Sequence, residues 1–475
     1  MVKKCLSVLC LFLFALLVYA DIAPAEIKAD YGGSLRLRQE YWENVIDLET
    51  LKAPDRDFFR LRTSLWGKVD FNPNIGIYTR VTNEARYYLG NFKPFEIAPG
   101  RPGYETSDSD RFDEDELIID NLYLDVKNIF GLPLDLRIGR QDFLGQYGEG
   151  FVILDGTPGD GSRTFYFNAA KATLKLHKNH SVDFIYIYNR QIDDLLPSLY
   201  PARSDYLAGY YRNRKVLNVS DERGYVVYGK SKLNDYFSIE PYFIRKEEDS
   251  VGRYGHRAPG PKSELHLNTY GGRVVFTAAN WKIRGEYARQ YGEYDDHGKD
   301  RDREGDGGYI FIGQKYAELP FKPEWELGYI YLSGDERGTS SKHEGWNPLF
   351  SRAPSWNEIL VYPMVYESMP DAGAIPAYWT NLRLYKLGMK LNLAKTTNLA
   401  LSYQYLRAVE KTNISSPVFS NDSKERGHIG TLLLAHSFTK QIDGFLQIEY
   451  FAPGAFYGHD AEDAIFARWQ LQFRF

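Results

Sequence analysis

Cysteine is nearly absent from this sequence: its two cysteines, Cys5 and Cys10, both lie in the first twenty residues. Two lysines, an apolar run and a small residue follow one another there, which predicts a secretory signal peptide over residues 1–20, or one that is cut after Ala25. The exported chain would then contain no cysteine, which excludes disulfides, thiolate metal sites and a catalytic thiol. Its stability must come from backbone pairing and burial.

Long apolar runs, linkers and catalytic motifs are also missing. No segment after the signal peptide has the run of about 18 apolar residues that a membrane helix needs, and no tract rich in Pro, Ser or Gly divides the chain. Residues 26–475 are therefore expected to form one domain. The sequence has no Gly-x-Ser-x-Gly or His-Glu-x-x-His motif, so we expect no enzymatic activity, no metal and no cofactor.

The charge balance excludes one class of partner. The formal net charge of −5 becomes −7 once Lys3 and Lys4 leave with the signal peptide. A mildly acidic chain lacks the basic footprint of a nucleic-acid-binding protein. We therefore expect no nucleic-acid partner.

Strict alternation of apolar and polar residues is what the sequence has in place of these features. The last nine residues are ARWQLQFRF, in which Trp469, Leu471, Phe473 and Phe475 share one parity and polar residues the other. Such alternation predicts a strand with one apolar and one polar face. A soluble sheet would turn the apolar face to a core, whereas a transmembrane β-barrel turns it to lipid and lines a lumen with the polar face. The 37 tyrosines, against 28 phenylalanines, favour the barrel, because tyrosine suits the two rims of a membrane.

The same alternation, bounded by turn residues, recurs along the whole chain. It predicts eighteen strands, at residues 34–42, 58–71, 74–88, 117–127, 134–142, 163–177, 181–189, 224–231, 236–246, 266–278, 281–291, 307–319, 323–333, 379–393, 398–409, 427–438, 442–452 and 464–475. An even number is what a closed antiparallel barrel with both termini on one side needs. The last strand must then pair with the first to close the ring. The predicted fold class is an all-β, closed antiparallel transmembrane barrel.

The connections between these strands alternate in length. Every second joint is short, as at Asn72-Pro73-Asn74 and Ala279-Asn280, and the joints between are long and polar, as at residues 89–116, 190–223 and 334–378. Short turns belong on the periplasmic side of an outer-membrane barrel and long loops on the outside. A protein made of several β-sandwich domains has no reason to keep this alternation.

The polar parity of the strands, taken as the lumen, is rich in bases. The inward basic residues are Arg36, Arg38, Arg60, Arg62, Lys68, Arg80, Arg86, Arg137, Lys171, Lys175, Lys282, Arg284, Lys386, Lys390, Arg468 and Arg474. The inward acids, counted in the same way, are fewer: Glu40, Asp70, Glu84, Asp125, Asp135, Asp183, Glu240, Glu286, Glu324, Glu326 and Glu449. The basic excess gathers on the first three strands and the last, which are neighbours once the ring closes.

Two interpretations of these inward basic residues stay open. Rings of Lys and Arg select for anions, a low-dielectric wall focuses their field along a channel, and arginine binds carboxylates in a bidentate way. This predicts a passive conduit for an anionic solute such as a carboxylated polysaccharide. Alternatively, the charges form a ladder of Arg–Glu pairs that only holds the barrel open. A general porin for small solutes, and a structural or adhesive barrel plugged by a long loop such as 334–378, are the alternatives in function.

Several segments of the first third resemble the alginate-export family of outer-membrane barrels. They are GGSLRLRQEYWEN (residues 32–44), DFFRLRTSLWGKVDF (57–71), and LPLDLRIGRQDFLGQYGEGFVI followed by GSRTFYFNAAKATL (132–174). The resemblance is clearest up to Leu176 and rests on Gly139-Arg140-Gln141 with Gly148 shortly after. Beyond that point only the strand pattern continues it.

This resemblance implies a monomeric eighteen-stranded barrel in the outer membrane of a Gram-negative cell, whose basic lumen passes a uronate polymer. Arg36, Arg38, Arg60, Arg62 and Arg140 would be pore-lining or motif positions, although the parity of Arg140 faces lipid near the outer rim. The short joints leave no room for a periplasmic lid, so a plain porin for small solutes remains an alternative. The ending at Phe473 and Phe475 resembles the aromatic signal that the outer-membrane assembly machinery reads, so this machinery and outer-membrane lipid are the expected partners.

Overall fold

The computed structural model places most of the chain, apart from its first residues and parts of the loops. It describes residues 27–48, 55–89, 112–156, 161–200, 210–211, 214–215, 221–249, 263–296, 300–351, 356–360, 379–412, 418–420 and 422–475. The predicted signal peptide therefore lies outside the described residues. Within them, no helix is both long and apolar enough to cross a membrane.

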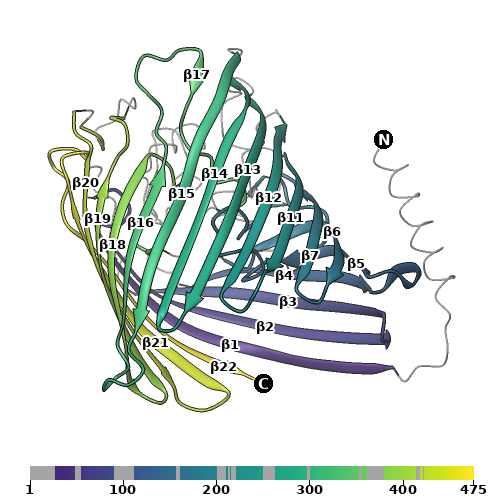
Figure 1. Ribbon diagram of the computed structural model, residues 1–475. Coiled ribbons are helices and arrows are strands. Elements are labelled where there is room, and N and C mark those ends of the chain that lie inside the picture. Colours follow the sequence, from purple (N-terminus) through teal and green to yellow (C-terminus); the bar gives the residue numbers. More distant parts are fainter. Residues whose placement is uncertain are drawn as a thin grey trace.

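Eighteen long strands form the wall of the molecule (Figure 1). Each pairs antiparallel with its neighbour in the order β1 (Lys28–Glu43), β2 (Arg56–Asn72), β3 (Ile75–Tyr88), β4 (Phe112–Val126), β5 (Leu134–Asp142), β6 (Tyr166–His177), β7 (His180–Asn189), β11 (Asp221–Lys232), β12 (Phe237–Asp249), β13 (Ser263–Ala278), β14 (Trp281–Asp296), β15 (Asp300–Lys315), β16 (Glu324–Leu332), β18 (Leu382–Ala394), β19 (Thr397–Arg407), β20 (Glu425–Ser437), β21 (Ile442–Pro453) and β22 (Ala464–Arg474).

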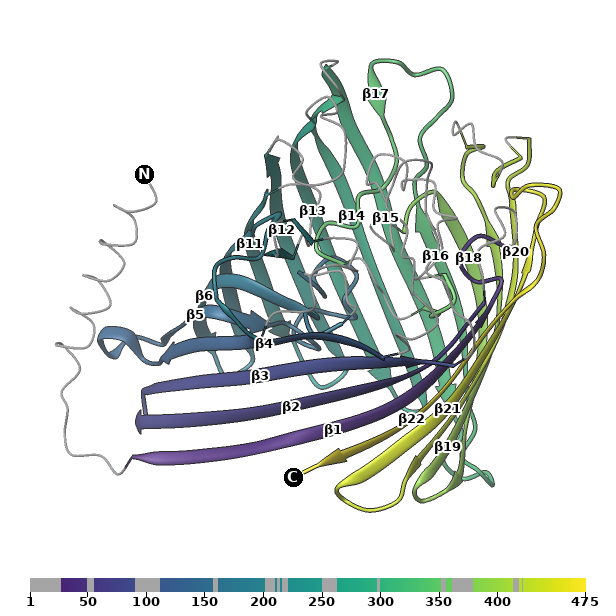
Figure 2. The same cartoon turned by 180° about the vertical axis from the view of Figure 1, so that it is seen from behind.

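The ring closes where the first strand meets the last. β1 pairs with β22 in a register that runs from Ser34↔Arg474 to Glu43↔Ile465. The backbone of Phe475 adds two further hydrogen bonds to Gly33, each 3.1 Å long. Figure 2 shows β1 and β22 side by side on the wall that faces the viewer. The predicted all-β, closed antiparallel barrel and its closure are confirmed.

The strand ends follow the turns that the sequence contains, but several strands are longer than predicted: β1 begins at Lys28, β4 begins at Phe112 and β14 ends at Asp296. The strand predicted at residues 307–319 runs from Asp300 to Lys315 instead. At its lower end Tyr316 N donates to Pro323 O and Leu319 N to Tyr316 O, so the chain reverses direction after Lys315. At its upper end, charged residues that do not alternate with apolar ones still pair with β14, up to Asp295↔Asp300.

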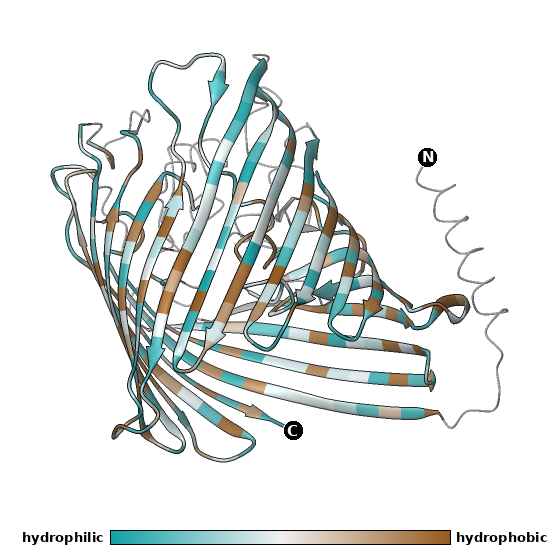
Figure 3. Cartoon of the chain, viewed as in Figure 1, coloured by the Kyte–Doolittle hydropathy of each residue, from teal (hydrophilic) through white to brown (hydrophobic). Residues whose placement is uncertain are grey.

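The outer face of the barrel is apolar over the lower part of the strands. Leu35, Leu37, Leu61 and Leu65 are all exposed there, and Figure 3 shows apolar and polar residues alternating along the strands. A band of exposed leucines is unfavourable in water, and it matches the lipid-facing band of an outer-membrane barrel.

Short elements add to the wall at its long-loop end. β8 (Ser198–Tyr200) pairs with β4 beyond the point where β5 ends, and β17 (Lys342–His343) pairs parallel with β15. β9 (Tyr210–Tyr211) pairs with β10 (Arg214–Lys215) in a separate two-stranded sheet. At the opposite, short-turn end, the 3-10 helix η1 (Ile129–Gly131) forms the turn between β4 and β5.

Two long loops fold into the barrel at this end. The loop after β5 meets the loop after β16, where Leu154 N and Asp155 N donate to Phe350 O and Phe151 stacks on Trp346 with ring centroids 5.1 Å apart. They pack on inward-facing apolar residues near the strand ends, such as Ile187 and Ile330, in one buried cluster. The expectation of a polar face along the whole lumen is therefore wrong for the long-loop half, because these loops bring their own apolar side chains inside.

Candidate functional site

The strand register brings the predicted arginines of β1, β2 and β3 onto one inward face. Arg36 lies opposite Arg62 and Arg38 opposite Arg60, while Arg60 lies opposite Arg86 on β3. β22 adds Arg468 opposite Glu40. We call this surface the basic wall; its seven arginines are Arg36, Arg38, Arg60, Arg62, Arg80, Arg86 and Arg468.

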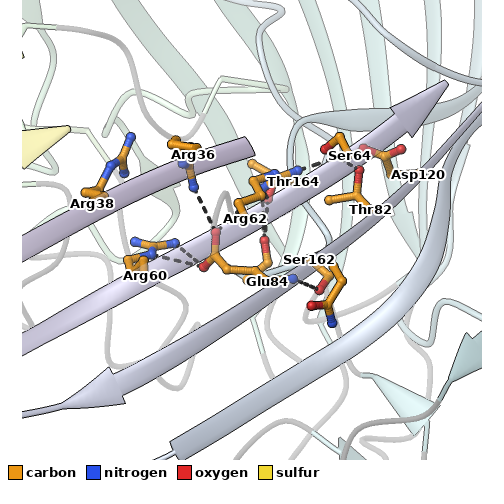
Figure 4. A network of polar contacts seen from close by, with 12 residues as sticks. Arg36, Arg38, Arg60, Arg62, Ser64, Thr82, Glu84, Asp120, Ser162 and Thr164 are labelled. Atoms are coloured by element: carbon orange, nitrogen blue, oxygen red, sulfur yellow. Dashed lines mark hydrogen bonds and ion pairs between the residues drawn. The ribbon is translucent and has the colours of Figure 1, made fainter. Parts of the chain in front are cut away.

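Glu84 on β3 is the centre of the basic wall (Figure 4). Its fully buried carboxylate lies 2.8 Å from Arg36 Nη2 and 2.6 Å from Arg60 Nη2. Arg62 Nη1 and Arg86 Nε are farther from it, at 3.8 and 3.9 Å. One carboxylate thus faces four guanidinium groups, and it reduces their mutual repulsion without neutralising all of them.

Glu40 on β1 holds a second group of arginines. Its fully buried carboxylate is 3.1 Å from Arg38 Nη1, 3.3 Å from Arg60 Nη1 and 3.0 Å from Arg468 Nε. Trp42 Nε1 donates to the same carboxylate at 3.3 Å. Arg60 contacts both Glu40 and Glu84, so it links the two groups into one network.

Asp120 on β4 is a member of the basic wall that the sequence did not reveal. Its buried carboxylate is 2.9 Å from Arg80 Nη2 and 3.8 Å from Arg62 Nη2. Counting by twos from the inward Asp125 assigns Asp120 to lipid. A register shift in the β3–β4 pairing between Arg80 and Val81 makes Asp120 the extra residue of a bulge and changes the parity. A bulge of this kind re-aims side chains, and no pattern in the sequence marks it.

Cations outnumber carboxylates on the basic wall. Its seven arginines share five described carboxylates, those of Glu40, Glu84, Asp120, Asp142 and Glu358. Arg80 and Arg86 keep about a quarter of their side chains exposed, at 25% and 22%, whereas Arg60 and Arg468 are buried. The more exposed guanidinium groups can add a carboxylate from a solute, since arginine offers a planar fork of donors.

The other predicted lumen residues form separate ion pairs and polar contacts. On the strands beside the basic wall, Arg137 Nε is 2.7 Å from Asp125, Lys171 Nζ donates to Gln146 at 2.7 Å, and Lys175 Nζ is 2.5 Å from Asp135. Arg474, at the short-turn end of β22, pairs with Asp443 and is half exposed.

Arg140 lies apart from the basic wall. Its side chain is buried and contacts Asn168, Asp193 and the ring of Tyr166. Arg163 reaches the same Asp193. Arg140 therefore holds the segment that follows β7 against β5 and β6 in this structure, and it is not part of the group of lumen arginines to which the family resemblance assigned it.

The wall opposite β2 has a different chemistry, and we call it the acid–tyrosine wall. Glu286 on β14 is buried and accepts hydrogen bonds from Tyr242 at 3.0 Å and Tyr309 at 2.9 Å. Arg273 lies 2.8 Å from Glu240, and Arg284 lies 2.6 Å from Glu326 and 2.8 Å from Glu149 of the in-folded loop. Lys386 lies 3.8 Å from Glu326. Lys282, Lys390 and Glu324 share this inward parity, so five cations face five carboxylates here.

The loop that carries β17 holds a histidine outside the membrane-spanning part of the strands. Burial lowers the pKa of His343 to about 2, and the nearby Arg303 and Arg301 guanidinium groups add to the effect. Neutral His343 can accept the hydrogen bond from Arg303 at its Nδ1 atom. This loop therefore carries no titrating histidine charge near neutral pH.

The two predicted assembly-signal residues are exposed at the short-turn end. Phe473 is 41% and Phe475 62% exposed. A Cβ on Gly33 would lie 2.6 Å from the Phe475 ring, so the glycine allows this ring to lie over β1. Recognition by the assembly machinery stays a prediction.

A closed barrel of eighteen strands with an apolar outer face and a charged lumen is an outer-membrane channel protein. The sequence model of the alginate export family matches residues 27–149 and 211–469, and the chain belongs to this family. The predicted family is thereby confirmed, and the protein is a transport protein of the Gram-negative outer membrane and not an enzyme. A comparison with curated proteins finds no match.

Solved structures of the same fold include OccAB1 of Acinetobacter baumannii, at 13% identity with a TM-score of 0.54, covering 94% of this chain and 96% of that one. A BenF-like porin from Pseudomonas fluorescens has 10% identity and a TM-score of 0.54, covering 94% and 98%. Pseudomonas aeruginosa OccK2 (OpdF), solved in complex with glucuronate, has 10% identity and a TM-score of 0.55, covering 94% and 98%. At identities this low, the similarity to these structures shows a shared fold alone.

Proposed function

We propose that this barrel passes anionic saccharides of the uronate type, as polymers or fragments, across the outer membrane along its basic wall. The observation that carries the proposal is the surplus of arginines there, seven against five described carboxylates. The glucuronate bound to OccK2, a barrel of similar fold, supports a carboxylated sugar as the ligand class.

The geometry explains how such a solute would be held. Guanidinium groups bind carboxylates in a bidentate way, and the low dielectric of the barrel wall strengthens the attraction. Partial occupation of the arginines by Glu40 and Glu84 keeps the binding of each sugar weak, and a channel needs sites that release their solute as well as attract it. Across the lumen, the partly exposed carboxylates of Glu240 and Glu326 can accept hydrogen bonds from sugar hydroxyls.

Planar-bilayer recording of the purified protein tests this proposal. In a salt gradient we expect a reversal potential of the sign that anion preference gives. Replacing Arg36 and Arg62 by Gln should lower the anion-to-cation permeability ratio roughly two- to threefold, because fixed charges in the lumen set it. The matched control is Arg474→Gln, whose exposed side chain lies outside the basic wall.

Saccharide binding is measured on the same channels. Oligoglucuronate should interrupt the current at lower concentrations than a neutral oligoglucose of the same length. An unchanged reversal potential in the double variant, or equal interruption by both sugars, would contradict the proposal. A current without anion preference would indicate a general porin.

One observation favours a second candidate, a barrel plugged by its own loops. The loops after β5 and β16 join inside the long-loop half, where Ile153 pairs with Phe350 and both are buried. If this contact blocks the lumen, the protein acts as a structural or adhesive barrel. Bilayers that contain correctly folded protein would then show no current at all.

A further inference from the structure

The hairpin of β14 and β15 is longer than the membrane requires. Each strand has 16 residues, which is about 54 Å of extended chain, or about 41 Å along the membrane normal at a tilt of about 40°. The lipid-facing apolar band of such barrels is about 25 Å tall. The upper part of the hairpin therefore stands outside the hydrocarbon, as its height in Figure 1 suggests.

Aromatic residues mark both edges of the apolar band on β14. Trp281 contacts Trp325 at the short-turn end, with ring centroids 5.6 Å apart. Tyr291, ten residues later on the same strand, stacks on Tyr270 at 5.7 Å. Ten residues rise about 26 Å along the normal at this tilt, which is close to the height of the band. Tyr291 thus marks the outer interface, where lipid headgroups begin.

Just above this interface the outer face of the barrel is hollowed. A groove of about 630 Å³, which we call the outer groove, is lined by Arg245, His266, Tyr291, Glu293, Asp302 and Glu304 among others. The register places these side chains on the lipid-facing parity: His266 lies opposite Glu293, and Tyr291 lies opposite Glu304. Arg245 and His266 keep 42% and 45% of their side chains exposed, so both are accessible from the membrane side.

We propose that the outer groove binds the phosphorylated sugar headgroup of a glycolipid of the outer leaflet. Arg245 Nε lies 2.7 Å from Glu247, and His266 Nδ1 lies 3.9 Å from the same carboxylate. The other nitrogens of both side chains can supply the donors that a phosphate needs. The carboxylates of Glu293, Asp302 and Glu304 can accept hydrogen bonds from sugar hydroxyls, and the Tyr291 ring offers a face for the sugar. The three carboxylates repel the phosphate of either lipid class, but only a glycolipid brings the hydroxyl donors that offset this repulsion.

The surface below the groove suits the rest of such a lipid. Phe243, Val274 and Ile310 lie on the same outward parity, nearer the short-turn end, and the latter two are exposed. Acyl chains that extend down from a headgroup in the outer groove would cover them. The mixed charge of the groove and the apolar surface beneath it fit one molecule together.

Native mass spectrometry of the full-length protein in detergent micelles tests the proposal with three probes: phosphorylated lipid A, dephosphorylated lipid A and phosphatidylglycerol. The unmodified protein should bind phosphorylated lipid A about tenfold more tightly than either of the others, the effect of one charge-assisted contact. The variant with Arg245→Gln and His266→Gln should lose this preference.

Arg383→Gln is the matched control, because Arg383 faces outward beside Tyr331 on the other side of the hairpin and lies outside the groove. A difference in gel migration between the unheated and the heated protein verifies that each variant is folded. Equal binding of the three lipids by the unmodified protein would overturn the proposal. So would an equal loss in the double variant and in the Arg383 control, which would indicate a general surface attraction.

Discussion

The basic wall and the acid–tyrosine wall of the lumen differ in their balance of charge. β1, β2, β3 and β22 bring together seven arginines and five described carboxylates. Halfway around the ring, β12 to β18 and one loop carry five inward cations against five carboxylates: Arg273, Lys282, Arg284, Lys386 and Lys390 against Glu149, Glu240, Glu286, Glu324 and Glu326. The difference sets up a field across the lumen that attracts anions toward the basic wall.

The two walls also differ in the partners that hold their buried carboxylates. On the basic wall carboxylates separate guanidinium groups that would otherwise repel each other, and Glu40 and Glu84 are fully buried. On the other wall Glu286 is held by the hydroxyls of Tyr242 and Tyr309. Removing one partner from the first arrangement leaves uncompensated buried charge, which is costly. Removing a carboxylate that tyrosine hydroxyls hold leaves neutral groups.

The largest effect is expected from Glu84→Gln. The substitution leaves Arg36 and Arg60 without the carboxylate that both contact within 2.8 Å. Breaking a buried charge network in this way costs about 3–5 kcal/mol of unfolding free energy. Urea unfolding of the protein in micelles measures the loss, with Asp70→Asn as the control, since the Lys68–Asp70 pair is about one-third exposed.

Glu286→Gln provides the comparison on the other wall. It keeps an acceptor for the tyrosine hydroxyls, so it should cost clearly less than Glu84→Gln, about 1–2 kcal/mol. Equal losses at Glu84 and Glu286 would show that the two walls do not differ in how they hold charge.

Much of the basic wall could be predicted from the sequence, because it lies on regular strands. Arg36 and Arg38 on β1, and Arg60 and Arg62 on β2, follow strict alternation, and the structure places them on one inward face. The closure of β1 on β22 followed from the apolar parity of the last residues and the even number of strands. Alternation decides these positions because lipid and the lumen impose opposite requirements on successive residues.

The parts that the sequence did not show depend on irregular backbone. Asp120 joins Arg80 because the β3–β4 pairing shifts register between Arg80 and Val81. Glu149 and Glu358 reach the two walls from loops that fold inward. A bulge or an inward loop is fixed by packing between segments distant in sequence, so the alternation of apolar and polar residues does not predict it.

Neutralising the acid–tyrosine wall should strengthen anion preference. Glu240→Gln combined with Glu326→Gln removes two carboxylates and leaves Arg273 and Arg284 in place. We expect the anion-to-cation permeability ratio to rise about twofold, because the lumen gains net positive charge. Reversal potentials in planar bilayers measure this. Glu425→Gln, at the exposed end of β20, is the control, and a fall in the ratio would contradict the two-wall comparison.

A smaller effect is expected from Glu149→Gln, which weakens the contact between the in-folded loop and the acid–tyrosine wall. Glu149 lies 2.8 Å from Arg284 and 3.4 Å from Arg273, and it is partly exposed. The loss of a partly exposed pair is worth about 1 kcal/mol or less. Hydrogen exchange of the loop after β5 should accelerate at most about fivefold, while Glu410→Gln, which frees Lys424 in another loop, should leave it unchanged. Unaltered exchange in the Glu149 variant would show that the apolar contacts with Trp346 alone hold the loop.

The smallest effect is expected at the exposed end of β22. Arg474 pairs with Asp443, but the arginine side chain is 52% exposed, so water screens the attraction. Arg474→Gln should change the unfolding free energy by less than about 1 kcal/mol, and the difference should vanish in 1 M salt, where the screening length is about 3 Å. Urea unfolding at low and high salt measures both quantities. A loss as large as that of Glu84→Gln would mean that burial does not decide which charges matter, and the contrast between the two walls would then have to be explained by the number of charges alone.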